Sequence, residues 1–157
     1  MPRALNPARM KAVSLKRREI LCGSFGFAAV IGWHRVALAE QTGAATDKRW
    51  YDAALAMKRL AESWGDQSYG AVLVLDHQLI GEGPSRVVQR SDGSAHAERE
   101  AIRDAQRRLK RTRLDGSILY STSRPCSACE SAAAAAGVSR MYFGESLRDA
   151  GVPKARE

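Results

Sequence analysis

Two short motifs place the strongest restriction on how this chain can fold. The first is His96-Ala97-Glu98, and the second is Pro125-Cys126-Ser127-Ala128-Cys129. One imidazole and two thiols are good zinc ligands, and three protein ligands leave a fourth position open for water, as a catalytic rather than a structural zinc site requires. The carboxylate of Glu98 is a candidate for moving the protons of that water. A fold that uses both motifs must bring these two distant segments together.

Both motifs lie where helices are expected to begin. From Ala95 to about Arg111 the apolar residues recur at helical spacing. Pro125 suits the first position of a second helix, which the alanine run 132–136 continues and Gly137 ends. Cys126 and Cys129 are three residues apart and therefore share a helix face. Two helix N-termini directed at one place create a positive patch that favours thiolates.

The remaining pattern alternates between helix and strand. A helix capped by Thr46 or Asp47 and stopped by Gly65 precedes a buried apolar strand at 71–75. The turn Asp76-His77, a second strand from Leu79 and a polar loop at 83–94 follow. Further strands are expected at 117–121 and 138–143. This order predicts a three-layer α/β domain with helices on both faces of the sheet.

The first 39 residues have the composition of an export signal. A basic segment containing Lys16-Arg17-Arg18 precedes an apolar, glycine-containing stretch, and Ala37-Leu38-Ala39 provides a small-residue cleavage site. We therefore expect a twin-arginine signal at 1–39, a mature domain at 40–157, transient contact with the export machinery and a periplasmic or exported location. The alternatives are an amphipathic helix or a membrane anchor, with the protein then cytoplasmic. The apolar run is short for a membrane span, so no stable anchor is expected.

This segment also explains most of the positive charge. The whole chain carries +8, but seven basic residues and one acidic residue lie in residues 1–39, so residues 40–157 carry only +2. A nearly neutral domain gives little electrostatic reason to expect nucleic acid as a partner. The basic cluster 107–113 has a simpler explanation, because cations stabilise the C-terminal end of a helix.

Residues from about 47 to 150 resemble the cytidine and deoxycytidylate deaminase superfamily, and within it the branch of small nucleobase and tRNA adenosine deaminases. The resemblance rests on the stretches 69–74, 80–83, 95–102, 125–129 and 139–144. It implies a mixed sheet of about five strands between helices, with one zinc per chain held by His96, Cys126 and Cys129. It also implies that Glu98 transfers protons and that the backbone N–H of Ala97 helps to bind the substrate ring.

The resemblance implies a hydrolytic deaminase that releases ammonia from a small aminated purine or pyrimidine base or nucleoside. It also suggests a homodimer, whereas an export signal makes tRNA an unexpected partner. The sequence departs from the family at Ser85, where relatives often have a substrate-binding Asn, and at Arg124, where they often have Glu. We expect both residues to contact substrate.

Two alternatives remain open: an inactive zinc-binding module with the deaminase fold, and a thiol–disulfide protein using Cys126 and Cys129. The second alternative has no use for His96-x-Glu98, and the Pro-before-Cys order is not the usual redox arrangement.

Overall fold

The computed structural model describes residues 43–155, so the predicted export signal at 1–39 lies outside the described residues. The helices and strands follow in the order α1 (Gly43–Ser63), β1 (Gly70–Leu75), β2 (Gln78–Pro84), α2 (Val87–Arg90), α3 (Ala97–Leu109), β3 (Ile118–Ser121), α4 (Ser127–Ala136), β4 (Arg140–Phe143) and β5 (Arg148–Gly151). Within this described part, no helix is both long enough and apolar enough to cross a membrane.

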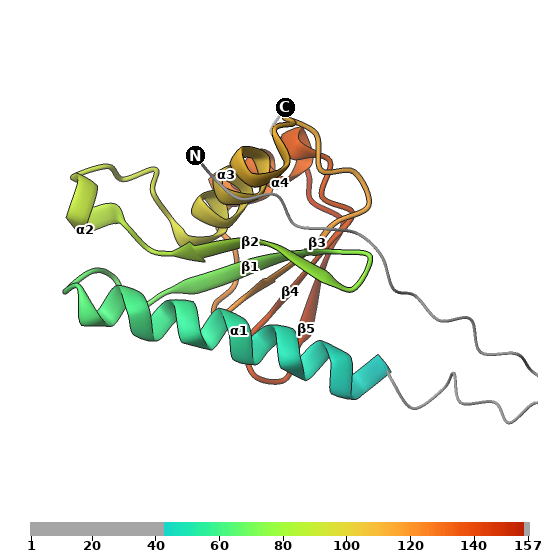
Figure 1. Ribbon diagram of the computed structural model, residues 1–157, viewed down its shortest axis with the longest axis horizontal. Coiled ribbons are helices and arrows are strands. Elements are labelled where there is room, and N and C mark those ends of the chain that lie inside the picture. The colour runs from blue at the N-terminus through green and yellow to red at the C-terminus, as the bar shows by residue number, and fades with distance from the viewer. Residues whose placement is uncertain (1–42, 156–157) are drawn as a thin grey trace, which may run out of the picture. The chain divides into compact units, whose positions relative to one another are not determined.

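The strands form one mixed sheet in the order β2-β1-β3-β4-β5. β3 and β4 are parallel, and every other neighbouring pair is antiparallel. Helix α1 packs on one face of the sheet, and α3 and α4 lie on the other (Figure 1). The predicted three-layer fold with a mixed five-stranded sheet is confirmed.

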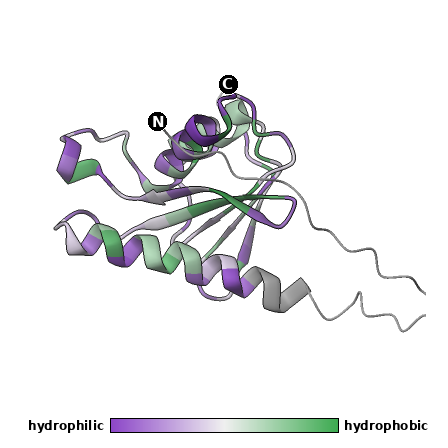
Figure 2. Cartoon of the chain, viewed as in Figure 1, coloured by the Kyte–Doolittle hydropathy of each residue, from purple (hydrophilic) through white to green (hydrophobic). Residues whose placement is uncertain are grey.

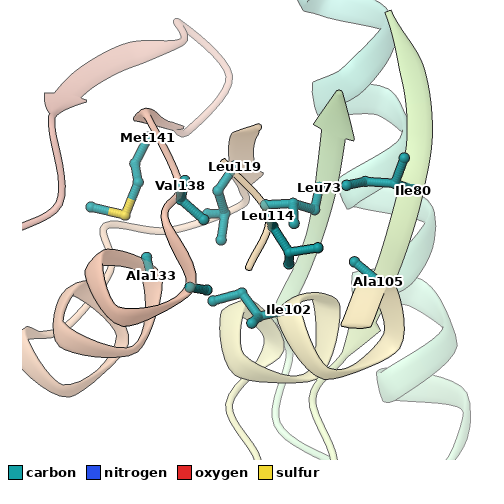
Figure 3. Packing of buried hydrophobic residues seen from close by; sticks show 10 residues of the cluster. Leu73, Ile80, Ile102, Ala105, Leu114, Leu119, Ala133, Val138 and Met141 are labelled. Atoms are coloured by element: carbon teal, nitrogen blue, oxygen red, sulfur yellow. The ribbon is translucent and has the colours of Figure 1, made fainter. Parts of the chain in front are cut away.

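Alternating side chains of β1 build a separate core on each side of the sheet. Val72 and Val74 contact the α1 side, where Trp50 and Ala54 are buried. Leu73 joins the larger core beneath α3 and α4 (Figure 3). Helix α3 is mainly hydrophilic in Figure 2, and its buried alanines and Ile102 form the face that meets the sheet. This burial of one apolar helix face is the main force that holds α3 on the sheet.

Two glycines of β2 allow α3 to approach the sheet closely. A Cβ atom on Gly83 would overlap the carbonyl oxygen of Ala97 and the backbone nitrogen of Ala101. A Cβ atom on Gly81 would overlap the carbonyl oxygen of Ala101 and lie 2.8 Å from the Cβ of Ala105. The backbone of β2 therefore fixes the depth at which the N-terminal turn of α3 lies.

Several predicted boundaries differ from those observed. The two-residue turn at Asp76-His77 is confirmed, since both residues have positive φ as a tight hairpin requires. The short helix α2 occupies part of the expected loop 83–94, and the polar strand β5 was not recognised from the pattern. Placing Pro125 at the first position of α4 was wrong, because the helix begins at Ser127 and Cys126 is its N-cap.

Candidate active site

The sheet topology brings the two motifs together at one edge of the sheet, the edge at which β3 has its C-terminal end. α3 leads into β3 and α4 leads away from it, so both helices run antiparallel to β3 and both begin near its C-terminal end. β1 is antiparallel to β3, and its first residue, Gly70, donates its N–H to the Thr122 hydroxyl just after β3. The segment before β1, the N-terminus of α3 and the segment after β3 therefore meet at this edge.

Three potential metal ligands converge there. The Nδ1 atom of His96 lies 3.7 Å from Sγ of Cys126 and 3.6 Å from Sγ of Cys129. All three ligand atoms lie within 4.8 Å of one another. Tetrahedral zinc with ordinary Zn–N and Zn–S bonds separates a nitrogen from a sulfur ligand by about 3.5–3.6 Å. The observed distances therefore fit a zinc ion held by His96, Cys126 and Cys129.

The ligands occupy the starts of their helices. His96 and Cys126 are the N-cap residues of α3 and α4, and neither forms a side-chain capping hydrogen bond. Both residues therefore lie one position before the first turn of their helices, whereas Cys129 lies in the first turn of α4. The N-termini of α3 and α4 therefore both lie at the ligand cluster, as the positive patch inferred from the sequence requires.

Cys129 needs a cation if it is to be a thiolate. Its side chain is 1% exposed. Burial raises the pKa of the Cys129 thiol far above its usual value, and the nearby Glu98 charge raises it further. A divalent metal reverses this preference because a coordinated thiol loses its proton.

Glu98 lies beside the ligands and faces the same cavity. Its carboxylate is 3.5 Å from Sγ of Cys129, which donates to it, and its side chain is largely buried. Burial raises the pKa of the Glu98 carboxyl, while its own backbone N–H, Cys129 and His96 act in the opposite direction. The structure thus places a buried carboxylate of α3 next to the proposed ligands, in contact with the Cys129 thiol of α4.

A cavity of about 240 Å³ opens in front of these residues, and its lining comes from the three segments that meet at this edge. The sequence predicted five lining residues: His96, Ala97, Glu98, Arg124 and Cys126. It missed Gln67, Tyr69 and Ser123 as lining residues. Only the strand order could have identified them, because Gln67 and Tyr69 precede β1, Ser123 follows β3, and these two strands are neighbours in the sheet.

Comparison with known proteins agrees with this geometry. The profile of the cytidine and deoxycytidylate deaminase zinc-binding region matches residues 44–145. The chain belongs to this family. Its zinc-binding region contains the cluster of His96, Cys126 and Cys129, so zinc is the cofactor that the donor atoms and the family both indicate.

The relatives include deaminases of different substrates. The chain is 38% identical over 103 residues to a tRNA-specific adenosine deaminase of Buchnera aphidicola, covering 66% of this chain and 68% of that protein. It is 44% identical over 61 residues to the guanine deaminase of Bacillus subtilis, covering 39% of each. The match to the Haemophilus influenzae tRNA-specific adenosine deaminase covers only 58% of that protein, so the chain spans roughly two thirds or less of its curated relatives.

The solved structures that resemble this chain also include both tRNA deaminases and guanine deaminases. A structure of a tRNA deaminase acting at the wobble position has a TM-score of 0.59 and 38% identity, covering 61% of this chain and 70% of the other. The guanine deaminase structure from Bacillus subtilis also has a TM-score of 0.59, with 32% identity and 62% of each chain covered. These similarities support a deaminase without fixing its substrate.

Ser85 of this deaminase-family domain is fully buried and does not belong to the cavity lining. Its hydroxyl donates to Asp66 at 2.9 Å. The same carboxylate accepts the backbone N–H groups of Gln67 and Gln89. Asp66 therefore ties the segment before β1 to the segment after β2, and the predicted contact of Ser85 with substrate stays a prediction.

The basic cluster behaves as the sequence suggested. Arg107 and Arg108 lie in the last turn of α3. Both pair with Asp104, at 2.6 and 2.7 Å, and Arg108 also pairs with Glu82. The positive charges of these two arginines are thus paired with carboxylates of the same domain.

Proposed function

We propose that this chain is a zinc-dependent hydrolytic deaminase that releases ammonia from a small aminated purine or pyrimidine base or nucleoside. The observation that carries this proposal is the buried carboxylate of Glu98, which lies beside three convergent zinc ligands and lines a cavity. A purely structural zinc site has no need of such a carboxylate.

The roles of the residues follow from their positions. Zinc bound by His96, Cys126 and Cys129 would supply a Lewis acid that makes water nucleophilic near neutral pH. Glu98 accepts a proton as water adds to the amino-bearing ring carbon. It then delivers that proton to the amino nitrogen, the C–N bond breaks and ammonia leaves. Ala97 is the first residue of α3 and lines the cavity, and we assign its backbone N–H as a donor to the substrate ring.

Transfer RNA is the second candidate substrate, because several relatives are tRNA-specific adenosine deaminases. The small net charge of residues 40–157 weighs against it. We also propose that residues 1–39 are a twin-arginine signal, so that the mature protein works outside the cytoplasm, where a small diffusible substrate is more accessible than tRNA. Detection of the uncleaved chain in the cytoplasm alone, after cell fractionation, would exclude this location.

The test is an ammonia-release screen with the zinc-loaded protein. It covers cytosine, guanine, adenine, their nucleosides and an RNA anticodon stem-loop. Glu98→Gln should lower the rate by at least roughly 10²-fold because glutamine cannot carry the proton. Glu145→Gln, on the exposed turn between β4 and β5, is the matched control and should keep full activity. Undiminished activity of Glu98→Gln would refute the assigned role.

Metal and thiol analysis separates the alternatives. One zinc per chain with protected Cys126 and Cys129 supports the deaminase, and zinc without any ammonia release supports an inactive zinc-binding module. A metal-free protein with a reversible disulfide between these two cysteines would support the redox alternative. Sedimentation of the same preparation tests the proposed homodimer.

A further inference from the structure

The mouth of the cavity carries positive charge that the proposed reaction does not use. Arg124 lines the cavity and is the only Lys or Arg among the eight residues that do so. Its guanidinium lies 5.9 Å from the ring centroid of Phe143. Within the described residues 43–155, no carboxylate forms an ion pair with Arg124. Several other arginines of this domain are paired, including Arg90, Arg103, Arg108 and Arg140.

A second guanidinium lies near the same aromatic ring, although its residue does not line the cavity. Phe143 is the last residue of β4 and pairs in register with Ser121 at the C-terminal end of β3, where the cavity opens. Arg148, the first residue of β5, is the register partner of Phe143. Its guanidinium lies 5.8 Å from the centroid of the same ring. The aromatic ring thus holds two exposed arginines at this edge of the sheet.

The charges around the cavity indicate what these arginines could bind. Zinc, two thiolates and a neutral imidazole sum to zero, and Glu98 adds one negative charge that would repel an anionic substrate. Arg124 offsets that charge and presents a planar fork of N–H donors, which suits phosphate or carboxylate. The other polar lining groups, Gln67, Tyr69 and Ser123, are neutral.

We infer that Arg124, assisted by Arg148, selects an aminated heterocycle that carries an anionic group, and nucleoside monophosphates are the probes of this class. This inference rests on the proposed deaminase function and narrows its substrate. The exposed guanidinium of Arg124 binds the anion at the mouth while the ring enters toward Glu98.

The test compares kcat/KM for cytidine, adenosine and guanosine with that for their 5′-monophosphates. For at least one pair, the monophosphate should be preferred, and added salt should weaken that preference because exposed charges are screened. Arg124→Glu should lower the ratio by roughly 10-fold or more, since a charge-assisted hydrogen bond is replaced by repulsion. Arg148→Ala should lower it less.

Arg111→Ala is the matched control. Arg111 is an exposed arginine beyond the C-terminal end of α3, at the opposite end of that helix from His96, and its loss should leave the ratio unchanged. A preference for the uncharged nucleoside in every pair overturns the inference, as does a ratio that Arg124→Glu does not alter. Faster deamination of an RNA stem-loop than of every mononucleotide also overturns it.

Failure of the reaction itself can be distinguished from failure of the inference. If no compound releases ammonia, binding of the three monophosphates to the zinc-loaded protein is measured by calorimetry. Binding that Arg124→Glu weakens and Arg111→Ala preserves would support anion selection even though the deaminase proposal had failed. Absence of binding to all three would overturn the inference.

Discussion

Replacing Gly83 with alanine should disturb the site although Gly83 contacts none of the proposed ligands. The added Cβ would overlap the carbonyl oxygen of Ala97 and lie 2.9 Å from the Cβ of Ala101. Both neighbours belong to a helix backbone or its first side-chain atom, so neither can rotate away. Relief requires α3 to move from β2 by roughly 1 Å, and a misplacement of this size can cost about 10²-fold in rate.

Two further quantities follow from the same displacement. Overpacking of this kind costs about 1–3 kcal/mol in the free energy of unfolding. Zinc affinity should fall by about 10–100-fold, as it does when groups that orient metal ligands are lost, because His96 moves with α3 while Cys126 and Cys129 stay with α4. Urea denaturation measures the first effect, and competition with a chromophoric chelator measures the second.

Gly93→Ala is the matched control for this substitution. Gly93 lies in the segment between α2 and α3, and a Cβ atom there would meet nothing within 4 Å. We therefore expect Gly93→Ala to keep the stability and zinc affinity of the unaltered protein. If Gly83→Ala matched Gly93→Ala in both measurements, the claim that β2 sets the depth of α3 would be refuted.

Two other predictions concern metal and pH. Chelation of zinc should lower the melting temperature and expose the thiols, with the exposed Cys126 reacting with a thiol reagent before the buried Cys129; equal rates would contradict the assigned burial. Although burial raises the pKa of Asp66, hydrogen bonds from Gln89, Gln67 and Ser85 outweigh it and lower that pKa below 3.8. Its contribution to stability is therefore present above about pH 4 and is lost as the pH falls through the lowered pKa. Urea denaturation should show that Asp66→Asn has a lower free energy of unfolding than the unaltered protein at pH 7, and that this difference shrinks below about pH 4. A difference that stays constant with pH would contradict the lowered pKa of Asp66.

The sequence alone predicted the metal centre well because each of its two motifs is a short segment whose residues are fixed by one helix start. Cys126 and Cys129 share a helix face by their separation, and His96 and Glu98 follow from one helix start. The lining residues Gln67 and Ser123 depend instead on which strands are neighbours, and nothing in their own segments marks them. β5 was missed for a different reason: its sequence, Arg-Asp-Ala-Gly, is polar and its strand lies at the sheet edge, so no alternating apolar pattern is required.

The starts of α3 and α4 show how local and global requirements conflict at this site. Ser, Thr, Asp or Asn would stabilise an N-cap, yet His96 and Cys126 occupy these positions and form no capping hydrogen bond. The two helices therefore begin with less local stabilisation than their sequences could provide, as often happens where residues serve chemistry. Zinc held by His96, Cys126 and Cys129 would stabilise both helix starts, and the close packing of α3 on Gly81 and Gly83 holds α3 in place beside it. These glycines are therefore part of the active-site architecture, although neither can touch a substrate.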